Sequence, residues 1–175
     1  MLEIELKVEV ASLDPVRERL TKKGAEFTGK DHEHDIYYNA PHRNFGETDE
    51  ALRVRYYKDH TLLTYKGKKL KEYGLKAREE FNTTVESGEV FEKILSRLGF
   101  TKTAEVNKWR ENYRLGDAAF ALDTVEGLGT FVEIEIMTEE NGAGAEAKIS
   151  TLAKEMGISG EPILASYLEL VLSRQ

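Results

Sequence analysis

Two stretches of the sequence alternate strictly between apolar and charged residues. Residues 2–8 read LEIELKV, and residues 131–137 read FVEIEIM. A period of two places alternate side chains on one face of a β-strand, so the charged residues of each stretch share a face. These charged residues are Glu3, Glu5, Lys7, Glu133 and Glu135. Carboxylates held so close repel each other unless a cation lies among them, and carboxylate oxygens are ligands for Mg²⁺ or Mn²⁺.

Basic residues recur with the same spacing in the rest of the chain. The polar faces of the other alternating stretches carry Arg53, Arg55, Lys66, Arg78, Glu80, Lys108, Arg110 and Asp123. Arginine forks and lysine ammonium groups match phosphate oxygens. Carboxylates bind divalent metal ions together with substrate phosphates. A triphosphate that carries a divalent metal ion therefore suits this set of side chains.

The competing interpretation is a one-sided antiparallel sheet whose charged face meets water. That interpretation is the simpler one for any single strand of this chain. The complete set favours an enclosed face, because arginine and lysine recur beside paired glutamates in almost every strand. The same face also lacks the mixture of Thr, Ser and Gln that an ordinary solvated sheet carries.

The composition narrows the class of protein. The chain has 175 residues, no cysteine and a formal net charge of -7. This length suits a single domain over residues 1–175, and the lack of cysteine excludes disulfides, a thiol nucleophile and thiolate metal ligands. The acidic balance argues against a nucleic-acid partner. We find no secretory signal and no apolar stretch long enough to span a bilayer, so we expect a cytoplasmic protein without a membrane partner.

The order of predicted elements indicates an α+β fold. Strands are expected at residues 2–10, 26–30, 35–39, 51–57, 61–66, 76–85, 100–115, 118–125 and 131–137. Helices are expected at residues 14–24, 90–98, 145–156 and 162–172, and a polar loop at residues 41–50. Asp14 can cap the first helix, and Pro15 fits its first turn. If the helices cover the apolar face of the sheet, the polar face points inward, which predicts a closed antiparallel barrel with a polar lumen.

Three further features have weaker implications. His32 and His34 lie two residues apart and could share a metal ion, but no third ligand is evident nearby, so we expect exposed strand histidines. Trp109 should face away from its charged neighbours and pack under a helix. Residues 67–74 are rich in lysine, with glycine at both ends, and read as a mobile loop. This loop is either a lid for an anion or a solvated run of charge.

The motif Glu3-Ile-Glu5-Leu-Lys7 resembles the ExExK motif of the CYTH superfamily, the triphosphate tunnel metalloenzymes. Further blocks that resemble the family follow in order through most of the chain. They lie at residues 35–38, 51–55, 63–67, 78–80, 108–110, 122–123, 127–135 and 166–170. The sequences of these blocks are most similar to those of the class IV adenylyl cyclase branch. One departure is Lys68, where a proline often follows the Tyr-Lys-Gly block of the family.

The resemblance implies an eight-stranded antiparallel tunnel that uses Mg²⁺ or Mn²⁺, and it suggests a homodimer. The metal-site acids that it implies are Glu3, Glu5, Glu80, Asp123, Glu133 and Glu135. The triphosphate-binding bases that it implies are Lys7, Arg53, Arg55, Lys66, Arg78, Lys108 and Arg110, with Lys7, Lys66 and Lys108 as catalytic candidates.

The reaction that the resemblance implies is conversion of ATP to cyclic AMP and pyrophosphate, as in a class IV adenylyl cyclase. A triphosphatase that hydrolyses inorganic, thiamine or nucleoside triphosphate is the alternative, because the same lumen serves both reactions. A second alternative is a non-catalytic module that binds polyphosphate or nucleotide. Such a module would keep the bases and could lose the acids; both sets are present here, which favours an enzyme. Side chains at the tunnel mouth decide between the reactions, and the sequence alone does not identify them.

Overall fold

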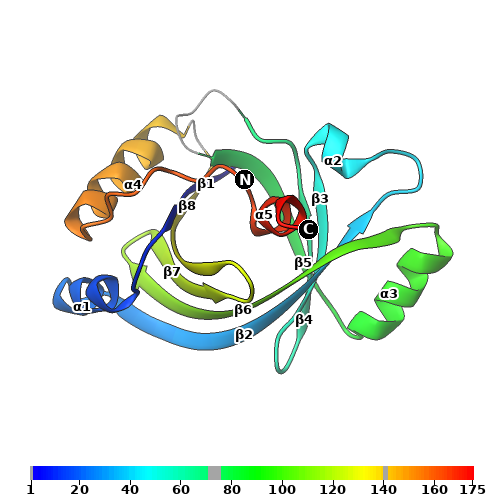
Figure 1. Cartoon of the computed structure of the whole chain (residues 1–175), viewed down its shortest axis with the longest axis horizontal. Coiled ribbons are helices and arrows are strands. Elements are labelled where there is room, and N and C mark those ends of the chain that lie inside the picture. Colours follow the sequence, from blue (N-terminus) through cyan, green and yellow to red (C-terminus); the bar gives the residue numbers. More distant parts are fainter. Residues whose placement is uncertain (1, 71–75, 140–141) are drawn as a thin grey trace.

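The computed structural model describes residues 2–70, 76–139 and 142–175, which form eight strands and five helices (Figure 1). The strands are β1 (Leu2–Glu9), β2 (Glu26–Asn39), β3 (Ala51–Tyr56), β4 (Thr61–Lys66), β5 (Lys76–Val85), β6 (Thr101–Leu115), β7 (Ala118–Val125) and β8 (Gly129–Thr138). The helices are α1 (Asp14–Lys22), α2 (Phe45–Thr48), α3 (Gly88–Arg97), α4 (Ala143–Glu155) and α5 (Tyr167–Ser173).

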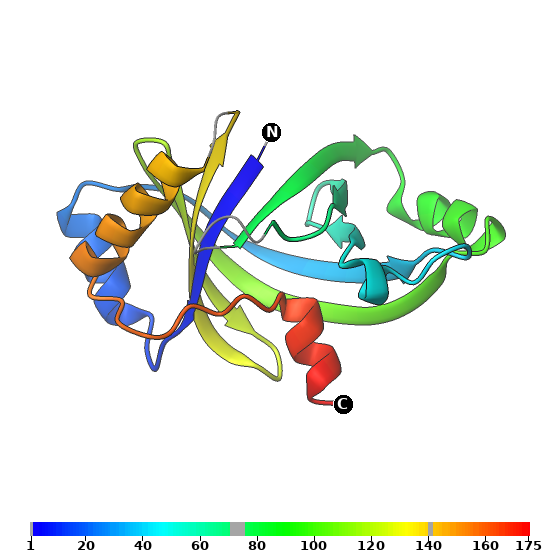
Figure 2. The same cartoon turned by 90° about the horizontal axis from the view of Figure 1, so that it is seen from above.

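The strands form one antiparallel sheet that closes on itself. Its order is β1-β5-β4-β3-β2-β6-β7-β8, and β8 pairs with β1 to complete the ring (Figures 1 and 2). The closing pair sets Glu5 opposite Glu135 and Lys7 opposite Glu133. Residues directly opposite each other in an antiparallel pair share a face, so these four side chains lie together. The predicted α+β fold with an eight-stranded antiparallel barrel is confirmed.

Two helices cover the apolar outer face of the ring where it closes. In the largest hydrophobic cluster, Ile4 of β1 and Ile134 of β8 are buried with Leu20 of α1 and Ile149 of α4. Figure 1 shows α1 and α4 on this side of the ring, outside the strands. Because this apolar face packs under helices, the opposite face of β1 and β8, which carries the charges, points into the lumen.

The second strand is longer than predicted. Residues 26–39 form one strand of 14 residues, not two strands separated by residues 31–34. The polar residues in between stay in the sheet because β6 pairs along them, with His32 opposite Trp109 and Glu33 opposite Lys108. The continuous ladder buries Glu33 of this part of β2 against Lys108, a base that lines the lumen.

Helix boundaries also differ from the predictions in two places. Asp14 is the first residue of α1, and the capping position belongs to Leu13, which makes no side-chain cap hydrogen bond, so the predicted Asp14 cap is wrong. Pro15 does lie in the first turn, as predicted. Within the expected polar loop at residues 41–50, residues 45–48 form the short helix α2, with Asn44 accepting a hydrogen bond from the Gly46 amide.

The last helix begins five residues later than predicted, at Tyr167. Ser166 caps it, and Glu169 completes a capping box by accepting from the Ser166 amide. The preceding segment is extended, and the Ile163 amide donates to the carbonyl of Lys7 in β1 at 2.7 Å. This segment carries Ser166 and Tyr167 to the wall of the lumen.

Some apolar side chains on the outer face are not covered. Leu95 of α3 is buried against the sheet, whereas Val90 and Ile94 of α3 and the C-cap residue Leu98 are exposed. Trp109 is 52% exposed and contacts His32 in a tilted geometry, with 5.0 Å between ring centroids, so the predicted packing under a helix is wrong. Across the described ranges 2–70, 76–139 and 142–175, none of the helices has the length and apolar composition needed to cross a bilayer.

The two histidines lie on the outer face, as expected for exposed strand residues. His32 is exposed, and His34 places Nε2 2.9 Å from Oε2 of Glu105. Half of the predicted lysine-rich loop at residues 67–74, namely residues 71–74, lies outside the described residues. In its described part, Lys69 Nζ contacts Asp49 and Glu169, and the Leu70 amide donates to Ala77.

Candidate functional site

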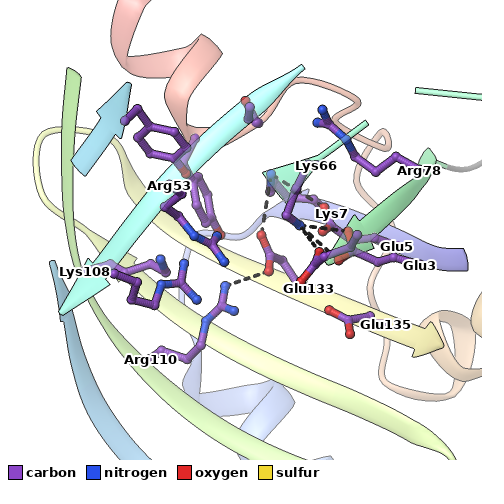
Figure 3. Close-up of a pocket in the computed structure, with 16 residues that line it drawn as sticks. Glu3, Glu5, Lys7, Arg53, Lys66, Arg78, Lys108, Arg110, Glu133 and Glu135 are labelled. Atoms are coloured by element: carbon purple, nitrogen blue, oxygen red, sulfur yellow. Dashed lines mark hydrogen bonds and ion pairs between the residues drawn. The ribbon is translucent and has the colours of Figure 1, made fainter. Parts of the chain in front are cut away.

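A polar cavity occupies the lumen of the ring (Figure 3). The side chains that line it come from most of the strands and from the start of α5. They are Glu3, Glu5, Lys7, Tyr37, Ala51, Arg53, Arg55, Lys66, Arg78, Glu80, Lys108, Arg110, Glu133, Glu135, Ser166 and Tyr167. Every site residue predicted from the sequence is in this set except Asp123. The structure thus brings together residues that are up to 132 positions apart, from Glu3 to Glu135.

Most of the charged side chains of the lumen are buried. Glu3, Lys7 and Lys108 are each 2% exposed, and Arg78 is 3% exposed. Charged side chains are almost never this buried unless they are paired. The interpretation of a solvated, one-sided sheet is therefore wrong, and the enclosed polar face is confirmed.

Three carboxylates meet at one place in the lumen and form what we call the acid cluster: Glu3, Glu5 and Glu135. One oxygen of each lies within 4.8 Å of the others. The strand period brings Glu3 and Glu5 to one face of β1, and the register with β8 brings Glu135 opposite Glu5. Carboxylate oxygens at this spacing suit a hard divalent cation such as Mg²⁺ or Mn²⁺. The donor set of the acid cluster therefore fits the metal ion that the sequence implies.

Protons bind unusually tightly to the acid cluster. Burial, together with the neighbouring carboxylates Glu5, Glu80 and Glu133, raises the pKa of Glu135 to about 7 against the opposing charge of Lys66. Burial also raises the pKa of Glu3 well above its ordinary value, helped by a hydrogen bond with Glu80. Both shifts have the cause expected for crowded buried acids, because desolvation and like charge disfavour the ionised form.

Lys66 neutralises the edge of the acid cluster. Its Nζ lies 3.0 Å from Oε2 of Glu3 and 2.6 Å from Oε2 of Glu80. Burial alone would lower the pKa of Lys66, but the charges of Glu3 and Glu80 outweigh burial and raise it. The pKa of Glu80 is lowered, because hydrogen bonds with Glu3 and Lys66 and the charge of Lys66 exceed its desolvation. Glu80 is thus a counterion of Lys66, beside the acid cluster.

Glu133 and Asp123 both bind Arg110. The guanidinium donates from Nε to Oδ1 of Asp123 at 2.7 Å and from Nη2 to Oε2 of Glu133 at 2.6 Å. Tyr167 donates its hydroxyl to Oδ2 of Asp123 at 2.6 Å. Asp123 is fully buried behind these partners and does not line the lumen. The structure therefore places Asp123 apart from the acid cluster, where it orients Arg110.

Lys7 lies between Glu5, Glu133 and the start of α5. Its Nζ is 3.7 Å from Glu5 and 3.5 Å from Glu133, and it donates to the Ala165 carbonyl at 3.1 Å. The ammonium also lies 4.2 Å from the ring centroid of Tyr167. Burial opposes the charge on Lys7, but Glu5 and Glu133 outweigh burial and raise its pKa. Lys7 therefore remains a cation inside the lumen.

Two buried acids that pair with bases of the lumen were missed in the sequence, Glu33 and Asp35 of β2. Arg55 donates two hydrogen bonds, of 2.6 and 2.8 Å, to the carboxylate of Asp35 and lies 3.0 Å from Glu33. Lys108 Nζ lies 2.7 Å from Glu33 and 3.1 Å from Asp35. Against the effect of burial, Arg110, Arg55 and Lys108 lower the pKa of Glu33 to about 2.

The signal for these two acids was present in the sequence. Asp31, Glu33, Asp35 and Tyr37 alternate with the same period of two as the other polar faces. The predicted break at residues 31–34 concealed this alternation. The pairing of Asp35 with Arg55 and of Glu33 with Lys108 is set by the strand neighbours of β2, which the sequence does not show.

Arg53 is a base of the lumen whose guanidinium is only partly hydrogen-bonded. Its Nη2 donates to Oγ1 of Thr64 at 3.1 Å, and its Nε is buried without a hydrogen-bond partner. Among the described residues, no carboxylate forms an ion pair with Arg53. Buried donors are normally hydrogen-bonded, so an anion bound in the lumen would account for the unpartnered Nε of Arg53.

Comparisons with known proteins agree on one family. A family model described as the CYTH domain matches residues 1–167. A Methanocaldococcus jannaschii protein named a putative adenylate cyclase is 37% identical over 173 residues, which cover 97% of this chain and 98% of that protein. A solved structure of a Pyrococcus horikoshii OT3 protein is 36% identical, with a TM-score of 0.89 over 99% of both chains.

A more distant structure shares the fold alone. A protein from Hippeastrum, described as having a dominant triphosphatase activity, is 19% identical to this chain. Its TM-score is 0.72, and the match covers 99% of this chain and 96% of that protein.

Proposed function

The chain belongs to the CYTH domain family, and on this premise we propose that it converts ATP to cyclic AMP and pyrophosphate, like a class IV adenylyl cyclase. Members of the family are metal-dependent enzymes, adenylate cyclases or triphosphatases, that act on triphosphate substrates. We further propose that residues 1–175 act as one domain and that the active protein is a homodimer without a nucleic-acid partner.

The observation that carries the proposal is the separation of charge inside the lumen. The acid cluster lies on β1 and β8, whereas Arg53, Arg55, Lys108 and Arg110 project from β3 and β6 (Figure 3). The three crowded carboxylates favour a divalent cation, and the buried Nε of Arg53, which has no hydrogen-bond partner, favours an anion. A triphosphate with its divalent metal ion supplies both at once.

We assign metal binding to Glu3, Glu5 and Glu135, with Glu80 and Glu133 beside them. When bound, Mg²⁺ or Mn²⁺ would supply Lewis acidity that polarises the phosphoryl oxygens and acidifies the attacking hydroxyl. Asp123 supports the site indirectly through its hydrogen bonds with Arg110. These roles rest on the geometry of the carboxylates and on burial of the cluster.

We assign triphosphate binding to the seven bases of the lumen: Lys7, Arg53, Arg55, Lys66, Arg78, Lys108 and Arg110. In the cyclase reaction, the ribose 3′-hydroxyl attacks the α-phosphorus and pyrophosphate leaves. Lys7, Lys66 and Lys108 would stabilise the negative charge that develops on the phosphoryl oxygens and the leaving group. Arg110 is already oriented by two carboxylates, so little reorganisation is needed when the substrate arrives.

The triphosphatase remains the alternative reaction. The same bases and acids would serve a water molecule that attacks a phosphorus of inorganic, thiamine or nucleoside triphosphate. The non-catalytic binding module has less support, because it has no use for three carboxylates gathered within 4.8 Å.

A product assay tests the proposal. ATP, inorganic triphosphate and thiamine triphosphate are each incubated with Mg²⁺ or Mn²⁺, and cyclic AMP, pyrophosphate and phosphate are resolved. We expect metal-dependent formation of cyclic AMP and pyrophosphate from ATP, and its loss in Glu135→Gln. The matched control Glu126→Gln alters an exposed glutamate in the turn before β8 and should retain activity. Phosphate as the dominant product would establish the triphosphatase, and saturable binding without product would establish the binding module.

A further inference from the structure

We propose that a second cavity, which adjoins the lumen, holds the nucleobase of a nucleoside triphosphate whose phosphates occupy the lumen. The inference rests on the proposed function and goes further, because it names the part of the substrate that lies outside the polar tunnel. The cavity lies between α2 and α5, and we call it the side cavity. Its walls are Tyr38, Asn39, Asn44, Phe45, Gly46, Asp49, Glu50, Ala51, Leu52, Arg78, Thr103, Ser166, Leu168, Glu169 and Leu172.

The side cavity and the lumen meet at three shared residues. Ala51, Arg78 and Ser166 line both cavities. Arg78 is held at this junction by hydrogen bonds to the carbonyls of Gly67 at 2.7 Å and Asp49 at 3.1 Å. Figures 1 and 2 show α2 and α5 close to each other, and β3 begins at the junction residue Ala51. A ligand with its phosphates in the lumen can therefore extend past Arg78 into the side cavity.

The walls of the side cavity differ chemically from those of the lumen. Its apolar side chains come from both flanking helices and from the sheet: Phe45 of α2, Leu52 of β3, and Leu168 and Leu172 of α5. Leu168 and Leu172 are four residues apart, so they share one face of the helix. Sites for organic ligands are typically apolar with a few polar groups, whereas phosphate sites are polar and basic.

The acids on the wall of the side cavity already have cationic partners. Lys69 Nζ lies 3.1 Å from Asp49 and 2.8 Å from Glu169. Arg43 Nη2 lies 2.7 Å from Glu50. The charges of these acids are thus compensated by bases that do not line the cavity. An uncharged aromatic ring suits such a surface better than a phosphate group or a cationic ring does.

The position of the side cavity bears on which triphosphate the protein selects. Inorganic triphosphate has no group that reaches beyond the lumen, so it leaves the side cavity without a ligand. A nucleoside triphosphate buries its base there and gains contacts that inorganic triphosphate cannot make. The side cavity is therefore a specificity element for nucleotides, which the cyclase reaction requires.

The test compares two ligands and two leucine variants. Leu172 is 43% exposed at the rim of the side cavity, and Leu172→Trp should fill the cavity without disturbing the lumen. Leu98→Trp is the matched control, because Leu98 is 63% exposed beyond the end of α3 and lines neither cavity. The ligands are the bis-methylene analogues of ATP and of inorganic triphosphate, in which carbon replaces both bridging oxygens. Their dissociation constants are measured by calorimetry with Mg²⁺ or Mn²⁺ present.

We expect Leu172→Trp to weaken binding of the ATP analogue at least tenfold and to change binding of the triphosphate analogue less than twofold. Leu98→Trp should change neither by more than twofold. Equal weakening of both ligands, or no change in either, would overturn the inference while the proposed function stands. If wild type binds neither analogue, the proposed function fails, and the inference fails with it.

Two further measurements keep the test decisive. If Leu172→Trp does not fold, Leu168→Ala replaces it and should weaken the ATP analogue three- to tenfold, again without effect on the triphosphate analogue. Thiamine triphosphate is titrated into wild type beside the ATP analogue. Tighter binding of thiamine triphosphate that is also lost in the leucine variant would assign the cavity to a different ring and overturn the nucleobase assignment.

Discussion

The Nζ atom of Lys66 lies 3.0 Å from Oε2 of Glu3, so a residue assigned to the triphosphate neutralises a residue assigned to the metal ion. Arg110, also assigned to the triphosphate, likewise places Nη2 2.6 Å from Oε2 of Glu133, which lies beside the metal-binding acids. Most acids and bases of the lumen thus form ion pairs with one another in this structure. Binding of a metal-triphosphate must replace part of these contacts, and it does so with groups of matching charge.

The Lys66–Glu3 pair predicts opposite effects of one substitution on stability with and without metal. Lys66→Gln leaves Glu3 and Glu80 without their ammonium, and breaking a buried pair costs on the order of 3 kcal/mol, so the melting temperature without metal should fall. Mn²⁺ should then raise the melting temperature by more than in wild type, because no ammonium competes for Glu3. Thermal melts followed by circular dichroism, in chelator and in Mn²⁺, measure both effects.

The control for this experiment is an exposed ion pair. Lys148 contacts Asp117 at the surface, and Lys148→Gln should change neither the melting temperature nor the response to Mn²⁺. A melting temperature of Lys66→Gln equal to that of wild type in chelator would contradict the assigned pairing.

Glu133 and Glu135 should respond differently to the same substitution. Glu135→Gln removes one of three crowded carboxylates, so the metal-free protein should be at least as stable as wild type, and the stabilisation by Mn²⁺ should be largely lost. Glu133→Gln removes a partner of Arg110 and Lys7, so the metal-free protein should melt at a lower temperature. Parallel melts of the two variants compare them directly. Equal loss of stability in both would show that Glu135 is also held as a counterion.

Substitutions of Arg53 and Arg55 should separate the effect on triphosphate affinity from the effect on stability. Arg53→Met removes a guanidinium without a carboxylate partner, and we expect triphosphate affinity to fall by about 1.5–3 kcal/mol, or roughly tenfold or more, with little change in stability. Arg55→Met removes the ion pairs that Arg55 forms with Asp35 and Glu33, so it should lower the melting temperature as well as the triphosphate affinity. Calorimetric titration and thermal melts are run on both variants. Unchanged affinity in Arg53→Met would remove Arg53 from the binding site.

Tyr167 joins α5 to the barrel through Asp123. Tyr167→Phe keeps the ring against Phe131 and Lys7 but removes the hydroxyl that donates to Asp123. Asp123 keeps both hydrogen bonds from Arg110, so the loss of stability should be modest, about 1 kcal/mol. Denaturant unfolding measures it. A loss of several kcal/mol would mean that Arg110 does not compensate Asp123 on its own.

The alternation of charge was sufficient to predict the strands and the inward polar face. Glu3, Glu5 and Lys7 had to share one face because a strand repeats every two residues, whatever it pairs with. The apolar residues between them had to be covered by helices, which left the charged face for the lumen. The same period of two applies at residues 31–37. Because a break between two strands was wrongly predicted there, Glu33 and Asp35 were not recognised as buried acids.

The partners of each charge were decided by the tertiary structure. The sequence treats Glu133 and Glu135 alike, yet the register of β8 against β1, and the place of Arg110 on β6, put Glu135 in the acid cluster and Glu133 on a guanidinium. The extended segment before α5 likewise brought Tyr167 onto Asp123, 44 positions earlier in the chain. Strand periodicity is a local property of the backbone, whereas register and closure depend on packing between distant segments, so only the folded ring could show which acids remain available for a metal ion.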